Sequence, residues 1–512
     1  MDTLRDLFAG ADAASPAILT LDRPVLDYGG LEEVVADTAL ALQSFGIASQ
    51  DRVAMVLPNG PEMASCFVAV ASYCASAPLN PAYKAEELDF YLDDLDARLL
   101  IVAEGIDGPA RGVAERRGIA VAELVTDVSA PAGAFSLRGP EGTSVDAATA
   151  RGDDVCSEAA DVGLILHTSG TTSRPKMVPL TQRNLYASAG HIAASLALEP
   201  GDRCLNVMPL FHIHGLMAAV LATLSSGASV FCSPGFNALR FFSWLDASEA
   251  TWYTAVPTMH QSILDRAARN PDVLERHRLR FLRSSSASLP PQVMQRLEET
   301  FRAPVIEAYG MTEAAHQMAS NPLPPLLRKP GSVGPSAGPE MAIMNEAGDL
   351  LPRGEIGEVV IRGPNVTAGY LANPEANAAG FSDGWFRTGD QGRIDEEGYL
   401  TLTGRLKEII NRGGEKISPR EVDEILMDHE AVAQVVTFAL PHPRLGEEVA
   451  AAVVLEDGAE IDEKTLRGFA GERLAPFKVP AKVVFLDEIP KGATGKLQRI
   501  GLATKLGLDS GE

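Results

Sequence analysis

The chain has 512 residues, of which 46% are hydrophobic and 22% are charged. This length exceeds one ordinary core and predicts several packed units. Its 44 Lys and Arg residues stand against 68 Asp and Glu residues, and the formal charge of −24 disfavours nonspecific binding to nucleic acid or an anionic membrane. Residues 66–79 and 217–232 are apolar but shorter than a membrane span, so we expect buried helices or strands there.

Short apolar runs alternate with segments of helical periodicity over the first two thirds of the chain, as residues 291–301 illustrate. The strand-like runs are residues 52–59, 97–104, 162–170, 229–234, 251–257, 280–286 and 304–310. This alternation predicts an α/β fold built from layers with parallel sheets.

After Gly331 the sequence becomes rich in glycine, strands and turns, and residues 355–364 and 398–405 predict a small, β-barrel-like part. The last hundred residues read as a small α+β domain. Its expected helices are residues 418–429 and 463–474, and its expected strands are residues 432–440, 448–456 and 481–489. The charged turn at residues 404–414 suggests a large N-terminal domain over residues 1–404 and a C-terminal domain over residues 405–512.

Residues 168–176, Thr-Ser-Gly-Thr-Thr-Ser-Arg-Pro-Lys, directly follow an apolar strand. Hydroxyls, a glycine and a lysine in one loop can surround phosphate oxygens with donors, although a Ser/Thr-rich surface turn would look similar. The loop resembles the TSGTTGxPK signature of the adenylate-forming superfamily, with Ser173 in place of the usual glycine. That resemblance implies ATP binding by Thr168, Ser169, Gly170, Thr171, Thr172 and Lys176.

Further motifs of this superfamily follow in the family's order, so the resemblance covers nearly the whole chain. The segment from Tyr309 through Gly310 to Glu313 resembles YGxTE, which implies that Tyr309 lies against adenine, Thr312 touches the α-phosphate and Glu313 helps to hold Mg²⁺. A carboxylate is a typical hard-oxygen ligand for a Mg²⁺ that is shared with phosphates. Taken alone, the segment could equally be the end of a strand.

Three more segments extend the resemblance toward the C-terminus. Asp390, in Phe-Arg-Thr-Gly-Asp, is similar to the aspartate that accepts hydrogen bonds from both ribose hydroxyls. Arg405 resembles the arginine that contacts ribose and phosphate, and Lys496 matches the lysine of PxxxxGK that reaches the reacting carboxylate. Each segment alone could be a turn or a hairpin. Together, in this order, they indicate a two-step acid:CoA ligase that uses ATP, CoA and Mg²⁺.

The resemblance also implies a domain rotation between an adenylation step and a thioester-forming step. Lys407 falls on the family's hinge, and Gly413 and Gly414 would line the tunnel for CoA. These glycines could also do no more than form a turn. Lys496 is the cation expected to stabilise the charge that gathers during adenylation.

The acid site is expected to take a short, polar acid. His212 resembles the aromatic gate of CoA ligases and is a catalytic candidate, while His214, Ser286 and His316 add polar groups where a long acyl chain would need apolar walls. Residues 251–261 and 307–325 look like the oxalate:CoA ligase branch, which makes these four residues the candidate oxalate contacts. Malonate is the nearest competitor, followed by other small or medium-chain acids.

Two other functions are weighed against this one. A stand-alone amino-acid adenylation domain usually has an early pocket aspartate, and residues 233–244 offer none before Asp246. A non-catalytic nucleotide-binding relative would be expected to lack Lys496 or Glu313. The five cysteines are scattered and lack metal-binding spacing, and we expect neither a signal peptide nor a peroxisomal tripeptide. These observations predict a cytoplasmic enzyme that acts on small molecules. The oligomeric state stays open.

Overall fold

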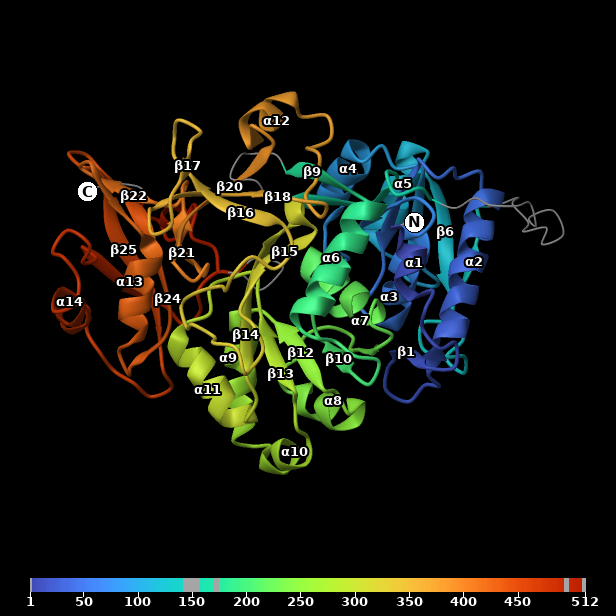
Figure 1. Cartoon of the computed structure of the whole chain (residues 1–512), viewed down its shortest axis with the longest axis horizontal. Helices are drawn as coiled ribbons and strands as arrows, with labels where there is room; N and C mark the ends of the chain where they lie inside the picture. The colour runs from blue at the N-terminus through green and yellow to red at the C-terminus, as the bar shows by residue number, and fades with distance from the viewer. Residues whose placement is uncertain (1, 141–156, 169–174, 492–496, 509–512) are drawn as a thin grey trace.

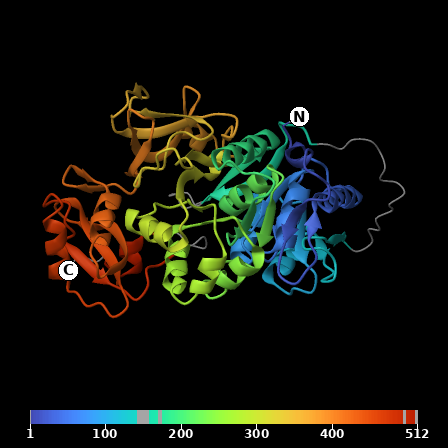
Figure 2. The same ribbon diagram turned by 60° about the horizontal axis from the view of Figure 1, so that its bottom comes forward.

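The computed structural model describes residues 2–140, 157–168, 175–491 and 497–508. A large N-terminal domain of α/β layers carries a smaller C-terminal domain at one end, opposite to α2 and β6 (Figures 1 and 2). This arrangement confirms the fold class that the alternating pattern of the sequence predicts.

The first layer is a seven-stranded sheet in the order β7-β6-β5-β3-β4-β8-β9. Its strands are β3 (Arg52–Val56), β4 (Ala75–Pro78), β5 (Leu99–Ala103), β6 (Ala120–Val125), β7 (Ser136–Arg138), β8 (Val162–Thr168) and β9 (Lys176–Thr181). The associated helices are α2 (Tyr28–Ser44), α3 (Pro61–Ala71), α4 (Ala85–Asp94) and α5 (Pro109–Arg117). The inner strands pair in parallel, whereas β7 and β9 pair antiparallel at the two edges.

The second layer is an eight-stranded sheet in the order β15-β14-β13-β12-β10-β11-β1-β2. Its strands are β1 (Pro16–Leu19), β2 (Leu26–Asp27), β10 (Arg203–Asn206), β11 (Ser229–Cys232), β12 (Trp252–Ala255), β13 (Phe281–Ser284), β14 (Val305–Met311) and β15 (His316–Ser320). The expected parallel pairing holds for the strands between the two edges, but at the edges β2 pairs antiparallel with β1 and β15 pairs antiparallel with β14. The link between β14 and β15 is the 3₁₀ turn Thr312–Ala314, which is too short for the crossover that a parallel strand needs.

The remaining helices of this layer are α1 (Leu4–Phe8), α6 (Gln182–Ser195), the π-helix His214–Leu221, α7 (Ala222–Leu224), α8 (Phe241–Ser248), α9 (Pro257–Ala267), α10 (Pro271–Arg276) and α11 (Pro291–Phe301). The helix α3 lies between the two sheets, where it contacts β4 and β8 on one side and β1 and β11 on the other. Every residue of α3 except Glu62 and every residue of the π-helix is buried, as a helix that is apolar all round requires. The two long apolar runs are therefore buried elements, as predicted.

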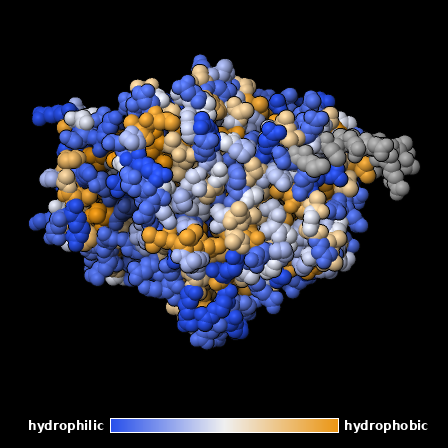
Figure 3. All heavy atoms as spheres, in the orientation of Figure 1, coloured by the Kyte–Doolittle hydropathy of each residue, from blue (hydrophilic) through white to orange (hydrophobic). Residues whose placement is uncertain are grey.

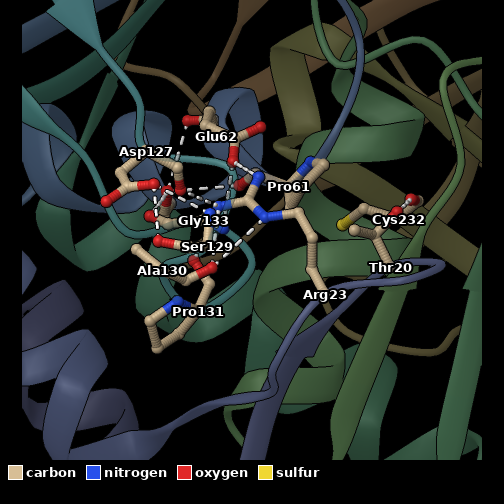
Figure 4. A network of polar contacts seen from close by, with 11 residues as sticks. Thr20, Arg23, Pro61, Glu62, Asp127, Ser129, Ala130, Pro131, Gly133 and Cys232 are labelled. Atoms are coloured by element: carbon tan, nitrogen blue, oxygen red, sulfur yellow. Dashed lines mark hydrogen bonds and ion pairs between the residues drawn. The ribbon is translucent and has the colours of Figure 1, made fainter.

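An arginine between β1 and β2 fixes the loop at residues 127–133 against the start of α3 (Figure 4). Arg23 forms an ion pair with Glu62, and its Nη2 donates to the carbonyl oxygen of Pro131 at 2.8 Å. Glu62 in turn accepts from the backbone N–H of Gly133 at 3.2 Å. One side chain thus ties the edge of the second sheet to the helix that separates the two sheets.

The glycine-rich stretch forms a six-stranded antiparallel sheet. Its elements are β16 (Glu340–Met344), β17 (Leu350–Leu351), β18 (Gly357–Arg362), α12 (Pro374–Gly380), β19 (Phe381–Ser382), β20 (Trp385–Ile394) and β21 (Leu400–Arg405). The strands pair in the order β17-β16-β18-β20-β19, and β21 adds to β20. This sheet brings Asp390 of β20 directly opposite Arg405 of β21.

The C-terminal domain has a core of its own around Leu426, Val453 and Leu466. Its elements are β22 (Ile410–Arg412), β23 (Glu415–Ile417), α13 (Pro419–Met427), β24 (Val432–His442), β25 (Gly446–Leu455), α14 (Glu463–Gly471), β26 (Lys482–Phe485) and α15 (Leu502–Lys505). It lies beside α9 and α11, where Gln261 donates to the carbonyl oxygen of Ala433 at 3.4 Å. The expected strands and helices of this region are present.

The visible surface is largely hydrophilic, with hydrophobic residues in small groups (Figure 3). Within the described ranges, the structure contains no helix that is both long enough and apolar enough to cross a bilayer.

The buried acid Glu307 of β14 makes stability depend on pH. Its side chain is 1% exposed, and its Oε1 accepts from the backbone N–H of Leu289 at 3.0 Å. Burial raises the pKa of this carboxyl to about 7, and the nearby charge of Arg420 opposes the rise only in part. The native carboxyl therefore keeps its proton at pH values where the unfolded chain, with a glutamate pKa near 4.5, has lost it.

Stability is accordingly expected to fall as pH rises from about 4.5 to about 7, because the native state binds more protons there. Glu307→Gln removes that slope and stabilises the protein at pH 8 by roughly 3 kcal/mol. Apparent melting temperatures of the wild type and the variant between pH 4.5 and 8.5 measure the effect, with Glu299→Gln on the surface of α11 as a control. Equal pH slopes in Glu307→Gln and the wild type would contradict this account.

Candidate active site

Three of the predicted nucleotide-binding residues form one connected group. Tyr309 lies on β14 and is 8% exposed. Its hydroxyl donates to Oδ2 of Asp390 at 2.6 Å. Arg405 donates from Nε to Oδ1 of the same carboxylate at 2.8 Å, and attraction by Asp390 raises the pKa of Arg405. The two bonds leave further lone pairs on the Asp390 oxygens, so the carboxylate is held in place while it can still accept from diol hydroxyls.

Glu313 and Lys176 meet at Tyr370. Oε1 of the buried Glu313 accepts from the Tyr370 hydroxyl at 2.9 Å, and the ammonium of Lys176 lies 4.4 Å from the centroid of the Tyr370 ring. Burial raises the pKa of Glu313, while Tyr370, Arg405 and Lys176 act in the opposite direction. Thr312 precedes Glu313 in the 3₁₀ turn that ends β14. Sequence reasoning missed Tyr370, whose Gly-Tyr context in a loop gives no signal beyond a turn.

Gly310 owes its place to the close approach of β15. A Cβ at this position would lie 1.7 Å from the carbonyl oxygen of His316, so any larger residue would collide with backbone. The pairing of Gly310 with Gln317 brings the start of β15 beside the end of β14. His316 and the YGxTE segment are thereby joined by the backbone itself.

Three of the four predicted acid-binding residues form a cluster, in which His214 and His316 are buried and Ser286 is half-buried. Nδ1 of His214 lies 3.1 Å from the Ser286 hydroxyl, and Nε2 of His214 lies 2.6 Å from the Thr254 hydroxyl. The His214 and His316 rings stack with centroids 4.8 Å apart. The half-buried His212 adjoins this cluster, because its Nδ1 accepts from the backbone N–H of His214 at 3.3 Å.

The backbone of this cluster is held in uncommon conformations. Ser286 has φ of 74° and His316 has φ of 93°, both in the left-handed region that non-glycine residues seldom adopt. Strain of this kind, of order 1–3 kcal/mol per residue, is concentrated at functional sites. His214 begins a π-helix, another geometry that is frequent at such sites.

A fully buried arginine, Arg283 of β13, lies against the same cluster and was missed by sequence reasoning. Its Nη1 lies 3.2 Å from Nε2 of His316 and 3.4 Å from Nε2 of His214. Its Nη2 donates to Oε1 of Gln317 at 3.1 Å, and burial lowers its pKa to about 9. The available signal was an arginine placed directly after Phe281 and Leu282 in a short strand-like run, and arginine is almost never fully buried without a partner.

Several candidates lie outside the described residues, namely Ser169, Gly170, Thr171, Thr172 and Lys496. The residues that flank the phosphate loop are paired, since Thr168 of β8 lies opposite Lys176 of β9. Around the segment of Lys496, Lys491 and Leu497 form a β-bridge, and the backbone N–H of Gln498 donates to the carbonyl oxygen of Pro490 at 3.2 Å.

The candidate CoA residues lie at the start of the C-terminal domain. Lys407 is on the exposed turn between β21 and β22, where the neighbouring Glu408 accepts from Arg499 at 3.2 Å. Gly413 and Gly414 form the β22–β23 turn with φ of 61° and 98°. Both glycines therefore adopt a backbone conformation that other residues rarely take. This conformation agrees with a simple turn and is also compatible with close approach of a ligand.

A mainly apolar cavity of about 290 Å³ lies beside the segment that carries His212. Its walls include Met63, Leu79, Pro209, Leu210 and Phe211. Among the described residues, no group of three or more His, Cys, Asp or Glu side chains could hold a metal ion. Glu313 alone nevertheless suits Mg²⁺, which commonly takes one or two carboxylates together with substrate phosphates.

Two family models match the chain. The model of the AMP-binding enzymes matches residues 11–371, and the model of the AMP-binding enzyme C-terminal domain matches residues 421–496. Together they cover both halves of the site described above.

Curated relatives and solved structures agree with these matches. An oxalate–CoA ligase of Arabidopsis thaliana is 48% identical over 93% of this chain and 92% of its own length. An oxalate–CoA ligase of Saccharomyces cerevisiae is 42% identical over 88% of this chain and 86% of its own length. The crystal structure of ATP-bound MatB from Rhodopseudomonas palustris superimposes with a TM-score of 0.88 at 30% identity, covering 99% of this chain and 98% of that one.

Proposed function

The chain belongs to the AMP-binding enzyme family, and we propose that it is an AMP-forming ligase that joins oxalate to CoA. The observation that carries the choice of acid is the polar cluster of the buried His214 and His316 and the half-buried Ser286, with the buried Arg283 against it. A long acyl chain would lose about 0.8 kcal/mol for each methylene that such walls fail to bury. The identity to oxalate–CoA ligases over nearly the whole chain supports the same choice.

In the first step a carboxylate oxygen of the acid attacks the α-phosphorus of ATP, and the bond to pyrophosphate breaks. No general base is required, because the acid is already ionised near pH 7. Asp390 would orient the ribose, Tyr309 would lie against the adenine, and Arg405 would contact ribose and phosphate. Positive charge placed around the α-phosphate, from Lys496 above all, would stabilise the negative charge that gathers in the transition state.

Glu313 is the residue that would hold Mg²⁺, with one oxygen already fixed by the Tyr370 hydroxyl. A bound Mg²⁺ would supply charge neutralisation at the phosphates. Thr312, the phosphate loop from Thr168 and Lys176 would provide the other donors around the triphosphate. Lys176 contacts the ring of Tyr370, and Glu313 accepts from the hydroxyl of the same residue. Both charges would therefore lie in the site, each against Tyr370.

In the second step the sulfur of CoA attacks the acyl carbon of the adenylate, a carbon–sulfur bond forms and AMP leaves. We propose that residues 405–512 rotate as a domain against residues 1–404, with the hinge at the exposed Lys407. Gly413 and Gly414 would then approach the incoming thiol arm. The cavity beside Phe211, with its apolar walls, would suit an uncharged chain such as pantetheine.

A pyrophosphate-release screen tests the proposal directly. Purified protein is assayed with oxalate, malonate, acetate, a fatty acid and a set of amino acids, each with and without CoA. We expect CoA-dependent turnover with oxalate and at least about 10-fold lower kcat/KM with malonate, whose additional methylene has to fit the same cluster. CoA-dependent turnover of another acid and none of oxalate would overturn the choice of acid.

A further inference from the structure

Arg283 is a buried cation whose described contacts include no carboxylate. Its side chain is fully buried, and its Nε has no hydrogen-bond partner. The groups that its Nη atoms meet are the two histidine rings, the Thr254 hydroxyl and the Gln317 amide oxygen. A buried charge without an opposite charge is costly, so an arginine held in this way fits a site that receives its counter-charge from a ligand.

The contacts of Arg283 determine which nitrogen of each histidine carries a proton. A guanidinium can only donate hydrogen bonds, so Nε2 of His316 at 3.2 Å acts as an acceptor, and Nε2 of His214 at 3.4 Å presents a lone pair rather than a proton toward Arg283. The Thr254 hydroxyl, 2.6 Å from Nε2 of His214, then donates to the same nitrogen. Both rings are therefore neutral and protonated at Nδ1.

This tautomer gives the acid site its donors. Nδ1 of His214 donates to Oγ of Ser286 at 3.1 Å, so the Ser286 hydroxyl accepts from the ring and directs its own proton elsewhere. A second carboxylate on the acid would need such N–H and O–H donors together with positive charge. The stacked rings, with centroids 4.8 Å apart, could not both be protonated beside Arg283 without strong repulsion.

We propose that Arg283 is the positioning residue for the second carboxylate of the acid, because it fixes His214 and His316 as neutral Nδ1–H donors and supplies the positive charge behind them. This inference rests on the proposed function, since it concerns an acid with two carboxylates. Gln317 holds the arginine in place, because its Nε2 is anchored to Ser195 at 2.9 Å and to the carbonyl oxygen of Ala337 at 3.1 Å. A monocarboxylic acid gains nothing from this arrangement.

The tautomers can be tested without any substrate. Nitrogen NMR of protein labelled with ¹⁵N in histidine alone separates protonated from unprotonated ring nitrogens, and His214→Gln and His316→Gln assign the two signals. We expect both rings of the wild type to be unprotonated at Nε2, and the His316 ring to change its protonation in Arg283→Met. Protonation at Nε2 in the wild type would overturn the inference whatever acid the enzyme uses.

Kinetics test the link to the acid. Arg283→Met is expected to raise KM for oxalate by about 100-fold or more, with kcat changed much less, because the loss falls on binding of the second carboxylate. Arg283→Lys keeps the positive charge but loses the planar set of N–H donors, so its KM for oxalate should rise less than that of Arg283→Met. Inhibition by glyoxylate, the analogue with a single carboxylate, should change little in either variant.

Arg280→Met provides the matched control, because Arg280 lies three residues earlier in the chain and pairs with Asp202 at 2.7 Å, away from the histidines. Melting temperatures and ATP affinity of all three variants separate local effects from damage to the fold. The inference fails if Arg280→Met raises KM for oxalate as much, or if Arg283→Met lowers kcat without changing KM. If the wild type does not use oxalate at all, the proposed function fails, and the NMR result still decides the tautomers.

Discussion

Lys496→Ala is expected to slow acyl-adenylate formation by about 10³-fold while it leaves most of the rate of thioester formation from a supplied acyl-adenylate. Adenylation gathers negative charge on the α-phosphate, and the cation that the PxxxxGK resemblance assigns to this step is Lys496. In the proposed domain rotation the thiol of CoA would approach from the space that this lysine leaves, so the second step would not depend on its charge.

Pyrophosphate release measures the first half-reaction, and consumption of the adenylate in the presence of CoA measures the second. Lys491→Ala is the matched control, since Lys491 lies five residues earlier in the chain and pairs with Glu488 at 3.0 Å. Gly414→Leu should show the reverse pattern, because a leucine at φ of 98° strains the turn that would meet the thiol arm. Equal loss of both half-reactions in Lys496→Ala would contradict this division of roles.

The second large effect is expected from Glu313→Gln, which should lower kcat/KM for ATP by roughly 100-fold and raise the Mg²⁺ concentration that gives half-maximal activity. Glutamine keeps the size of the side chain and its bond from the Tyr370 hydroxyl, which is 2.9 Å in the native protein. The lost negative charge therefore accounts for the change. Tyr370→Phe, which removes only the hydrogen bond, should cost about 10-fold or less.

Pyrophosphate release titrated with Mg²⁺ at several ATP concentrations separates the two parameters. Glu340→Gln serves as the control, because Glu340 pairs with Arg362 on the exposed surface of the small sheet. An unchanged Mg²⁺ requirement in Glu313→Gln would remove this residue from the metal site, whereas an unchanged KM for ATP would separate metal binding from nucleotide binding.

The sequence predicted the elements of the fold well where hydrophobic pattern alone decides them. The run at residues 162–170 is β8 up to Thr168, and residues 291–301 form α11 with the predicted bounds. The strand β15 was not predicted, since its five residues include His316 and Gln317, which do not resemble a strand. Its place at the sheet edge follows from backbone packing, because the absence of a side chain at Gly310 lets β15 approach.

Where motifs supply the residues of the candidate site, the structure brings three of them into contact. Tyr309, Asp390 and Arg405 come together as their motifs suggest, although they lie on three strands of two different sheets. Arg283 and Tyr370 could not be found in this way, because their importance comes from what they touch across the fold. An arginine in a short strand is a weak signal until the structure reveals the absence of a carboxylate among its described contacts.

The π-helix His214–Leu221 has a consequence for how acid specificity can change. An ordinary α-helix advances about 100° per residue, so loss of one residue from this wide segment would turn the first position by about 100° relative to the helix body that follows. His214 stands at its first position, and its partners Ser286 and Thr254 belong to other segments that would not move with it. Under the proposed function, the preference for an acid would therefore depend on the winding of the backbone as well as on side-chain identity.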